Sequence, residues 1–448
     1  MTKTLTNPST QAGINRRVGL LSILSGAMAL ATGCGGGGGG GTGAVAVADT
    51  ANAGGAGAGT APATGDIGQV AGVSSGGTGA ASVAEGSITG FGSIILNGNG
   101  IRIDDSKATV RDDDGNDLRG KLKLGMVVTV TGSTLFSAGA SAASILVGGE
   151  LVGRVAGAPN ATAQTFIVLG QTVKVTGSTV FDLSLPNGFA SLGNDTVVEV
   201  HGAYDPATNS VTASYIERET SPALFRIAGL VSNVDLVARK FSIGSTLINY
   251  SGASNVRVTP VNGALIRVRL NAVLPPVALP IEWTATRVRA PESLGDSVSN
   301  SNSQSQSVEA EIEGSISAFT SVTQFTVNGT VVDATTAAFP KGSAGLTVGT
   351  RVEVRGRLSA GVLVAQQVKI ESDSEIEGRE IELNGTISNV TASTFDVRGV
   401  KVNFSASTEF RKGTAANLVN GAKVEVKGVT TSSASSSTGV TATRISFE

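Results

Sequence analysis

Two short segments of the chain place an arginine at every second position. Residues 266–270 read Ile-Arg-Val-Arg-Leu, and residues 287–289 read Arg-Val-Arg. Alternate residues of a β-strand share a face, so these arginines and the nearby Trp are expected on one exposed face. Guanidinium groups bind phosphate and carboxylate groups, and an indole ring can cover a sugar. The candidate ligand-binding residues are Arg267, Arg269, Trp283, Arg287 and Arg289.

The charge balance around these arginines leaves a second interpretation open. Residues 223–290 contain 8 basic and 2 acidic residues, whereas the whole chain contains 33 basic and 35 acidic residues, with a formal net charge of −2. The arginines could therefore pair with acidic neighbouring segments and bind nothing external, which is the interpretation we favour. The near-neutral net charge argues against a nucleic-acid-binding protein.

Residues suited to catalysis or metal binding are scarce. The chain has one His and one Cys, which argues against a disulfide framework, a Cys/His zinc site and most His-based catalysis. His201 alternates with Val198 and Val200, which predicts an exposed position at a strand end. Residues 112–117 resemble half of a calcium loop but lack its later Glu, so a solvated hairpin turn is expected. We predict no catalytic residue, no metal site and no cofactor.

The first 34 residues resemble a bacterial lipoprotein signal. Basic residues precede an apolar segment at 18–29, which has the length of a signal peptide and is too short for a permanent membrane span. Leu-Ala-Thr-Gly then precedes the single cysteine, Cys34, as in a lipobox. We predict that residues 1–33 are removed and that Cys34 is lipidated; an ordinary signal peptide with an incidental Cys is the alternative. Gly35, in place of Asp, favours the outer membrane, and export by either the general secretory or the twin-arginine route stays open.

Residues 34–85 are predicted to form a disordered tether. They include seven consecutive glycines at 35–41 and are then dominated by Ala, Gly, Thr and Ser. Such a segment lacks the large apolar side chains that offset the entropy of ordering. About 50 residues of this kind reach on the order of 40 Å.

A pattern recurs five times from residue 86 onward. Each copy carries a form of Gly-x-x-Val-x-Val-x-Gly, clearest at 349–356 and 421–428, and then Ala-x-x-Ile or Ala-x-x-Val. The first motif ends at Gly132, Gly202, Leu270, Gly356 and Gly428. The one long spacing contains a polar Ser/Asn-rich linker at 291–307. We assign the repeats to residues 86–150, 151–222, 223–290, 308–374 and 375–448.

The repeats have the pattern of short strands. Apolar and polar residues alternate strictly in segments such as 352–355, and Asn-Gly pairs suited to hairpin turns occur at 97–98, 328–329 and 384–385. About five strands in about 70 residues predict an all-β chain of five tandem small β-barrel (OB-like) domains. A sandwich of the same strands is the alternative. Because domains of this size bury little surface, neighbouring copies are expected to pack on each other.

With a lipobox, a glycine-rich tether and these tandem motifs, the chain resembles the bacterial domain-of-unknown-function family 5666 (DUF5666). The resemblance covers about residues 86–448 and is clearest in the first, fourth and fifth repeats. The third repeat departs most, because Leu270 replaces the closing Gly and prolines follow. The resemblance implies an architecture and a location, and it implies no catalytic residues.

These observations predict a non-enzymatic, lipid-anchored protein of the cell envelope that serves as a binding or scaffold module. Its expected partners are the membrane, through the lipid on Cys34, and an anionic glycan or an envelope protein. The alternative is an envelope polysaccharide-processing or carrier protein.

Overall fold

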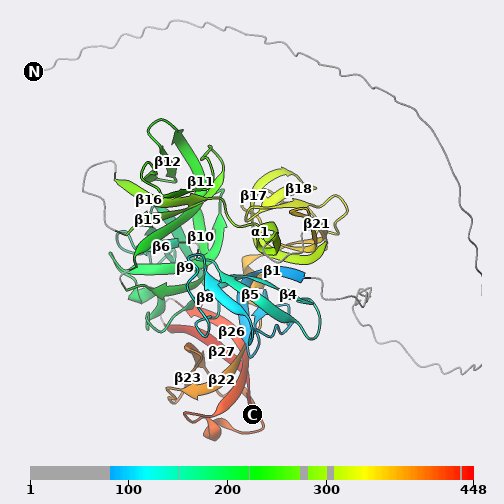
Figure 1. Cartoon of the computed structure of the whole chain (residues 1–448). Coiled ribbons are helices and arrows are strands. Elements are labelled where there is room, and N and C mark those ends of the chain that lie inside the picture. Colours follow the sequence, from blue (N-terminus) through cyan, green and yellow to red (C-terminus); the bar gives the residue numbers. More distant parts are fainter. Residues whose placement is uncertain (1–80, 150, 221, 273–280, 300–306, 434–435) are drawn as a thin grey trace, which may run out of the picture. The chain divides into compact units, whose positions relative to one another are not determined.

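The computed structural model describes residues 81–149, 151–220, 222–272, 281–299, 307–433 and 436–448 (Figure 1). The predicted signal peptide, Cys34 and residues 34–80 of the predicted tether lie outside these residues. Strand β1 begins at Ala81, so residues 81–85 of the predicted tether are part of a strand. Among the described residues, no helix is both long and apolar enough to cross a membrane.

Strands make up most of the described chain. The first repeat contains β1 (Ala81–Phe91), β2 (Ile95–Leu96), β3 (Thr109–Asp112), β4 (Val127–Ser133) and β5 (Ser141–Val147). The second contains β6 (Leu151–Arg154), β7 (Thr165–Val168), β8 (Gln171–Phe181), β9 (Val197–Asp205) and β10 (Ser210–Arg218), with a 3-10 turn at Gly188–Ser191. The third contains β11 (Leu224–Asp235), β12 (Lys240–Ile243), β13 (Thr246–Asn249), β14 (Asn255–Val256), β15 (Leu265–Asn271) and β16 (Glu282–Arg289).

The second half continues in the same way. Helix α1 (Leu294–Ser299) lies in the predicted linker and is followed by β17 (Val308–Ser321), β18 (Gln324–Val327), β19 (Thr330–Asp333), β20 (Arg351–Ser359) and β21 (Val362–Ile370). Helix α2 (Asp373–Glu377) precedes β22 (Ile381–Ser388), β23 (Thr394–Val397), β24 (Val400–Asn403), β25 (Glu409–Arg411), β26 (Lys423–Ser433) and β27 (Ser436–Phe447), with a 3-10 turn at Ala415–Asn417.

The strands are hydrogen-bonded into two large sheets. A 16-stranded sheet joins the strands of the first, fourth and fifth repeats, and an 11-stranded sheet joins those of the second and third. Strand β1 carries the junctions of the first sheet, because it pairs in parallel with both β17 and β22. In the second sheet, β6 pairs with β11.

The prediction of five tandem small OB-like barrels is wrong, although the chain is all-β. The sheets do not end where a repeat ends, and repeats that are distant in sequence share one sheet. Burial follows the same division, since one hydrophobic core combines side chains of the first and fifth repeats and another combines the second and third. The repeats join at β1, whose backbone N–H and C=O groups would stay unpaired at a sheet edge if the first repeat stood alone.

A β-bulge explains the two motifs that recur in the repeats. In β4–β5 pairing, the register shifts between Thr131 and Gly132, so that Gly132 lies opposite Ala142. A Cβ atom on Gly132 would lie 2.0 Å from the carbonyl oxygen of Ser141, so only glycine fits there. The extra residue also lets Ala142 and Ile145, three positions apart, both face the core.

The same close approach recurs at three further glycines. A Cβ would lie 2.1 Å from a carbonyl oxygen at Gly202 and at Gly356, and 2.2 Å at Gly428. The third repeat keeps the register shift, between Arg269 and Leu270, without the glycine.

We expect Gly356→Ala to lower the free energy of unfolding by about 2 kcal/mol, because the added methyl group meets the backbone oxygen of Val364. Chemical denaturation followed by circular dichroism measures this change. Gly252→Ala is the matched control, since no atom lies within 4 Å of its added Cβ. Equal stability of the two variants would contradict the role of the bulge.

Candidate functional site

Five arginines cover one face of three neighbouring strands. In the pairing of β15 with β16, Arg267 lies opposite Arg289 and Arg269 lies opposite Arg287. In the pairing of β11 with β15, Arg226 lies opposite Arg269. Like charges placed directly across a sheet repel each other, so this face needs anions.

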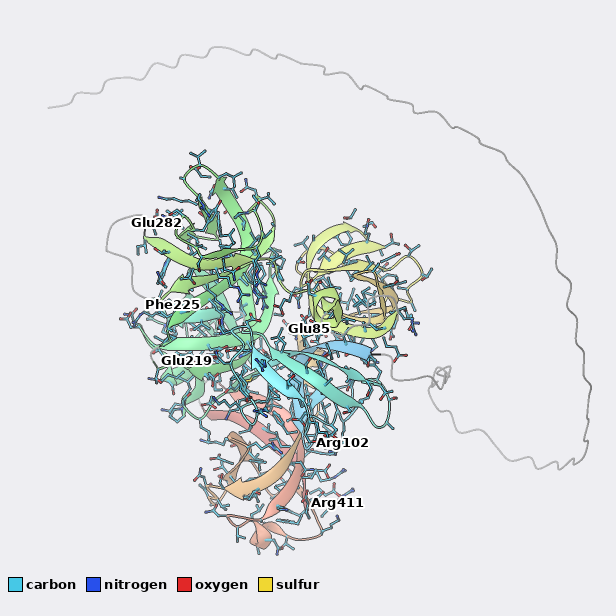
Figure 2. The ribbon with its side chains drawn as sticks, in the orientation of Figure 1. Glu85, Arg102, Glu219, Phe225, Glu282 and Arg411 are labelled. Atoms are coloured by element: carbon cyan, nitrogen blue, oxygen red, sulfur yellow. The ribbon has the colours of Figure 1, made fainter. Side chains whose placement is uncertain are left out.

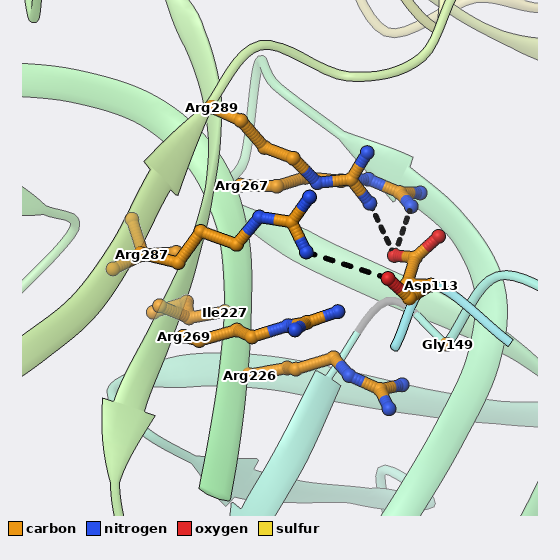
Figure 3. A pocket seen from close by; sticks show the side chains of 9 residues that line it. Asp113, Gly149, Arg226, Ile227, Arg267, Arg269, Arg287 and Arg289 are labelled. Carbon is orange, nitrogen blue, oxygen red and sulfur yellow. Dashed lines mark hydrogen bonds and ion pairs between the residues drawn. The ribbon is translucent and has the colours of Figure 1, made fainter. Parts of the chain in front are cut away.

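The anions come from the first repeat. The turn after β3 inserts Asp113 among the arginines, where its Oδ2 lies 2.5 Å from Nη2 of Arg289 and 3.4 Å from Nη1 of Arg267 (Figure 3). The backbone oxygen of Asp113 accepts a hydrogen bond of 3.4 Å from Arg287. The next residue, Asp114, forms ion pairs with Arg226 and Arg269.

The predicted arginines are therefore together, but their face is already covered. The space left among these side chains is only about 10 Å³, the size of about one water molecule. An external phosphate or carboxylate would have to displace Asp113. The pairing interpretation favoured by the charge balance agrees with this arrangement for Arg267, Arg269 and Arg289.

Burial and neighbouring charges shift the pKa values of Asp113 and of the arginines around it. Burial acts to raise the pKa of the Asp113 carboxyl group, but Arg267 and Arg289 outweigh it and lower that pKa below its ordinary value. Burial, together with repulsion between neighbouring guanidinium groups, lowers the pKa of Arg269 and Arg287. Two nitrogens in the cluster, Nη2 of Arg269 and Nε of Arg287, are buried without a hydrogen-bond acceptor among the described residues.

The prediction that Trp283 shares the arginine face is wrong. The bulge at Arg269–Leu270 shifts the alternation of β16, so that Ala285 and Val288 both face the core. Trp283, two residues before Ala285, therefore packs on the core side, with its ring 5.6 Å from that of Phe225, a residue labelled in Figure 2.

The acidic segment is a turn whose residues 114–117 are exposed, as the sequence predicts, and Asp113 is the exception. The Oδ1 atom of Asp112 accepts hydrogen bonds of 2.8 Å from the backbone N–H groups of Asp114 and Asn116, which fixes the turn. The side chain of Asp113, however, is only 5% exposed, because it points into the arginine cluster. Sequence reasoning missed Asp113, Asp114 and Arg226; the one available signal was an acidic run in a repeat distant from a basic one.

The prediction that His201 is exposed is also wrong. His201 lies on the face of β9 opposite Val200, as its alternation requires, but the first repeat covers that face and leaves it 0% exposed. Its Nδ1 lies 2.8 Å from the carbonyl oxygen of Gly148. Burial lowers the pKa of the His201 imidazole below its ordinary value.

Carboxylates surround the imidazole beside a cavity of about 620 Å³. Glu199 and His201 come from β9, Glu217 comes from β10, and Glu219 follows the end of β10. Burial, with Glu199 as the next contribution, raises the pKa of the Glu217 carboxyl group to about 7. Arg226, which lies 3.2 Å from Glu199, also lines this cavity.

A second hollow, of about 590 Å³, opens on the other side of the first repeat. Hydroxyl groups from β3, β4 and β5 line it together with arginines and with the carboxylates of Glu292 and Asp296. Arg111 and Arg257 are exposed there, and neither forms an ion pair with a carboxylate of the described residues. Arg289 lines both this hollow and the cluster around Asp113.

Comparison with known families identifies part of the chain. The model of the family described as Domain of unknown function (DUF5666) matches residues 152–217, 313–369 and 384–446, in the second, fourth and fifth repeats. The first repeat, which the motifs placed among the clearest copies, is not among these matches. No curated protein matches the chain.

We expect Asp113→Asn to destabilise the protein by about 3 kcal/mol at neutral pH, because it removes the buried anion that Arg267 and Arg289 both contact. The native state holds the pKa of Asp113 below its ordinary value of 3.8, so the unfolded chain takes up this proton first as the pH falls. The difference in unfolding free energy between wild type and variant should therefore be full above about pH 5 and shrink below about pH 4.

Denaturation curves between neutral and acidic pH measure this difference. Glu309→Gln is the control, because Glu309 is exposed and forms no ion pair among the described residues. It reports the effect of losing a carboxylate that has no such partner. A pH-independent difference for Asp113→Asn would contradict the proposed ion pairs.

Proposed function

We propose that this chain, which carries three DUF5666 domains, is a non-enzymatic lipoprotein of the cell envelope that acts as a binding module for an anionic glycan. The proposed location rests on three sequence features: an apolar segment at 18–29, Leu-Ala-Thr-Gly at 30–33, and the single Cys34. Residues 1–33 act as the export signal and the lipid on Cys34 anchors the protein, with Gly35 favouring the outer membrane. Residues 34–80 link this anchor to the β-strands.

The observation that carries the binding function is the pair of exposed arginines in the 590 Å³ hollow. Neither Arg111 nor Arg257 forms an ion pair among the described residues, unlike Arg267, Arg269 and Arg289. An acidic neighbour of Arg111 along the turn is Asp117, which lies opposite it in an isolated bridge. A new anion can approach them without displacing a side chain that holds the protein together.

The lining of the hollow supports a saccharide rather than an apolar ligand. Thr109, Thr129, Thr131 and Ser144 contribute hydroxyl groups. These groups already form hydrogen bonds within the protein, and their oxygen atoms keep lone pairs that accept from sugar hydroxyl groups. Guanidinium groups match phosphate and carboxylate substituents in geometry as well as charge. An acidic saccharide, such as the phosphorylated core of a lipopolysaccharide, combines both kinds of group.

We expect Cys34→Ser to release the protein from the membrane fraction or to leave its signal peptide uncleaved, because the thiol is the site of lipid attachment. Fractionation of cells and the electrophoretic mobility of the protein measure this. Unchanged fractionation and mobility of the variant would refute the lipid anchor.

We expect Arg111→Ala with Arg257→Ala to weaken binding of lipopolysaccharide or an acidic glycan by about tenfold or more, which corresponds to about 1.4 kcal/mol. Titration with the purified full-length chain measures the affinity, and the wild-type affinity should fall as salt screens the exposed charges. Assay of the glycan after incubation should find no product.

Two further variants make this test specific. Arg411→Ala with Lys412→Ala removes two charges from elsewhere on the chain and should leave binding unchanged. Arg267→Ala with Arg287→Ala should lower the melting temperature, since these groups contact Asp113. If this last pair abolishes binding at an unchanged melting temperature, the ligand site is the arginine cluster and not the hollow.

A further inference from the structure

Two carboxylates lie directly opposite each other beside the buried histidine. In the antiparallel pairing of β9 with β10, Glu199 pairs with Glu217 and His201 pairs with Tyr215. Like charges at directly opposed positions of a sheet repel each other, and these two face a partly enclosed cavity rather than open solvent. The arrangement calls for a cation between the two strands.

The hydrogen bonds of His201 leave one nitrogen directed at this cluster. A carbonyl oxygen can only accept, so Nδ1 donates its proton to Gly148. In the neutral ring Nε2 then carries a lone pair, and it is buried without a hydrogen-bond partner among the described residues. It lies 3.5 Å from Oε1 of Glu199. A lone pair that faces a carboxylate oxygen is unfavourable unless a cation lies between them.

The ring orientation is the one found for histidine metal ligands. Such residues donate their second ring N–H to a backbone carbonyl or carboxylate, which fixes the tautomer and directs the other nitrogen at the metal. His201 meets this description through Gly148.

We propose that Glu199, His201 and Glu217 form a binding site for a divalent cation of the class that accepts one imidazole and two carboxylates, with Zn²⁺ as its representative. One ligand atom from each residue lies within 4.8 Å of the other two. Zinc binds histidine nitrogen and carboxylate oxygen at about 2.0–2.2 Å, so the two Glu side chains close in by about 1 Å on binding. The adjoining cavity of about 620 Å³ has room for the water molecules that would complete the coordination.

The groups that already contact Glu199 and Glu217 leave ligand atoms available for a cation. Arg226 contributes its Nη1 to Glu199 at 3.2 Å, but it also has Asp114 as a second partner for its other nitrogen. The phenol O–H of Tyr215 is shared between Oε2 of Glu217 at 3.1 Å and Oδ2 of Asp182 at 3.2 Å, which leaves Oε1 of Glu217 for the cation. Glu219 lines the same cavity and adds negative charge without belonging to the set of three ligands.

The test is titration of the purified full-length chain, first stripped with a chelator, with ZnCl₂ in a calorimeter. We expect one site per chain whose affinity falls by about tenfold or more in Glu217→Gln and in His201→Gln, since even outer-shell partners contribute at least that much. Glu219→Gln, in the same cavity and two residues further along the chain, is the matched control and should stay within about twofold of the wild type. X-ray absorption at the zinc edge should report one imidazole and oxygen ligands.

If His201→Gln fails to fold, Glu217→Gln still tests the proposal. This substitution removes one of two opposed carboxylates and so relieves their repulsion, and it should not destabilise the metal-free protein. Absence of stoichiometric Zn²⁺ binding by the wild type would overturn the proposal. So would equal affinities in the wild type and Glu217→Gln, or equal losses in Glu217→Gln and Glu219→Gln. None of these results bears on glycan binding at Arg111 and Arg257.

Discussion

The parallel pairing of β1 with β17 is the interaction on which the arrangement of the repeats depends. It joins the first repeat to the fourth through the pairs Val83–Ala310 and Glu85–Ile312, and it buries the carboxylates that flank the junction. Each of these needs a partner, and each receives one from the turn of the other repeat. Asn97 donates to Glu311 at 2.9 Å, and Asn328 donates to Glu85 at 2.9 Å. A buried carboxylate without such a donor would cost several kcal/mol, so these pairs specify which strands meet.

The first repeat consequently contacts every other repeat. Its β1 strand pairs with β17 and β22, its Asp113 turn enters the arginine face of the third repeat, and its Gly148 carbonyl covers His201 of the second. At each contact, the first repeat buries a strand face that would be exposed to water in the other repeat alone. Ionisable side chains gather at two of these contacts, where the first repeat meets the third and where it meets the second.

The sequence predicts the strands and most of the turns, but it does not predict which repeats contact each other. The β class follows from alternation, and the turns at 97–98 and 328–329 have the left-handed backbone that Asn-Gly favours. The pair at 384–385 instead lies within β22, where pairing with β26 overrides its turn preference. Trp283 could have been placed correctly: an Ala-x-x-Val spacing inside a strand puts two core residues three positions apart, which already requires a bulge. The burial of His201 and Asp113 could not, since nothing within their own repeats indicates which repeat covers them.

The contacts between repeats also explain why some arginines are paired with aspartates of the chain and others are exposed. A guanidinium group at a contact between repeats must be neutralised by the chain itself, because a charge buried without a partner costs more than the contact gains. Asp113 meets that requirement for Arg267 and Arg289, and in doing so it closes the face to other anions. Arg111 and Arg257 lie just beyond the contact, where water still solvates them and no such requirement applies. The arginines that the sequence marks most strongly are thus already paired with aspartates of this chain. Arg111 and Arg257, where we propose the anion site, are the ones that stay exposed.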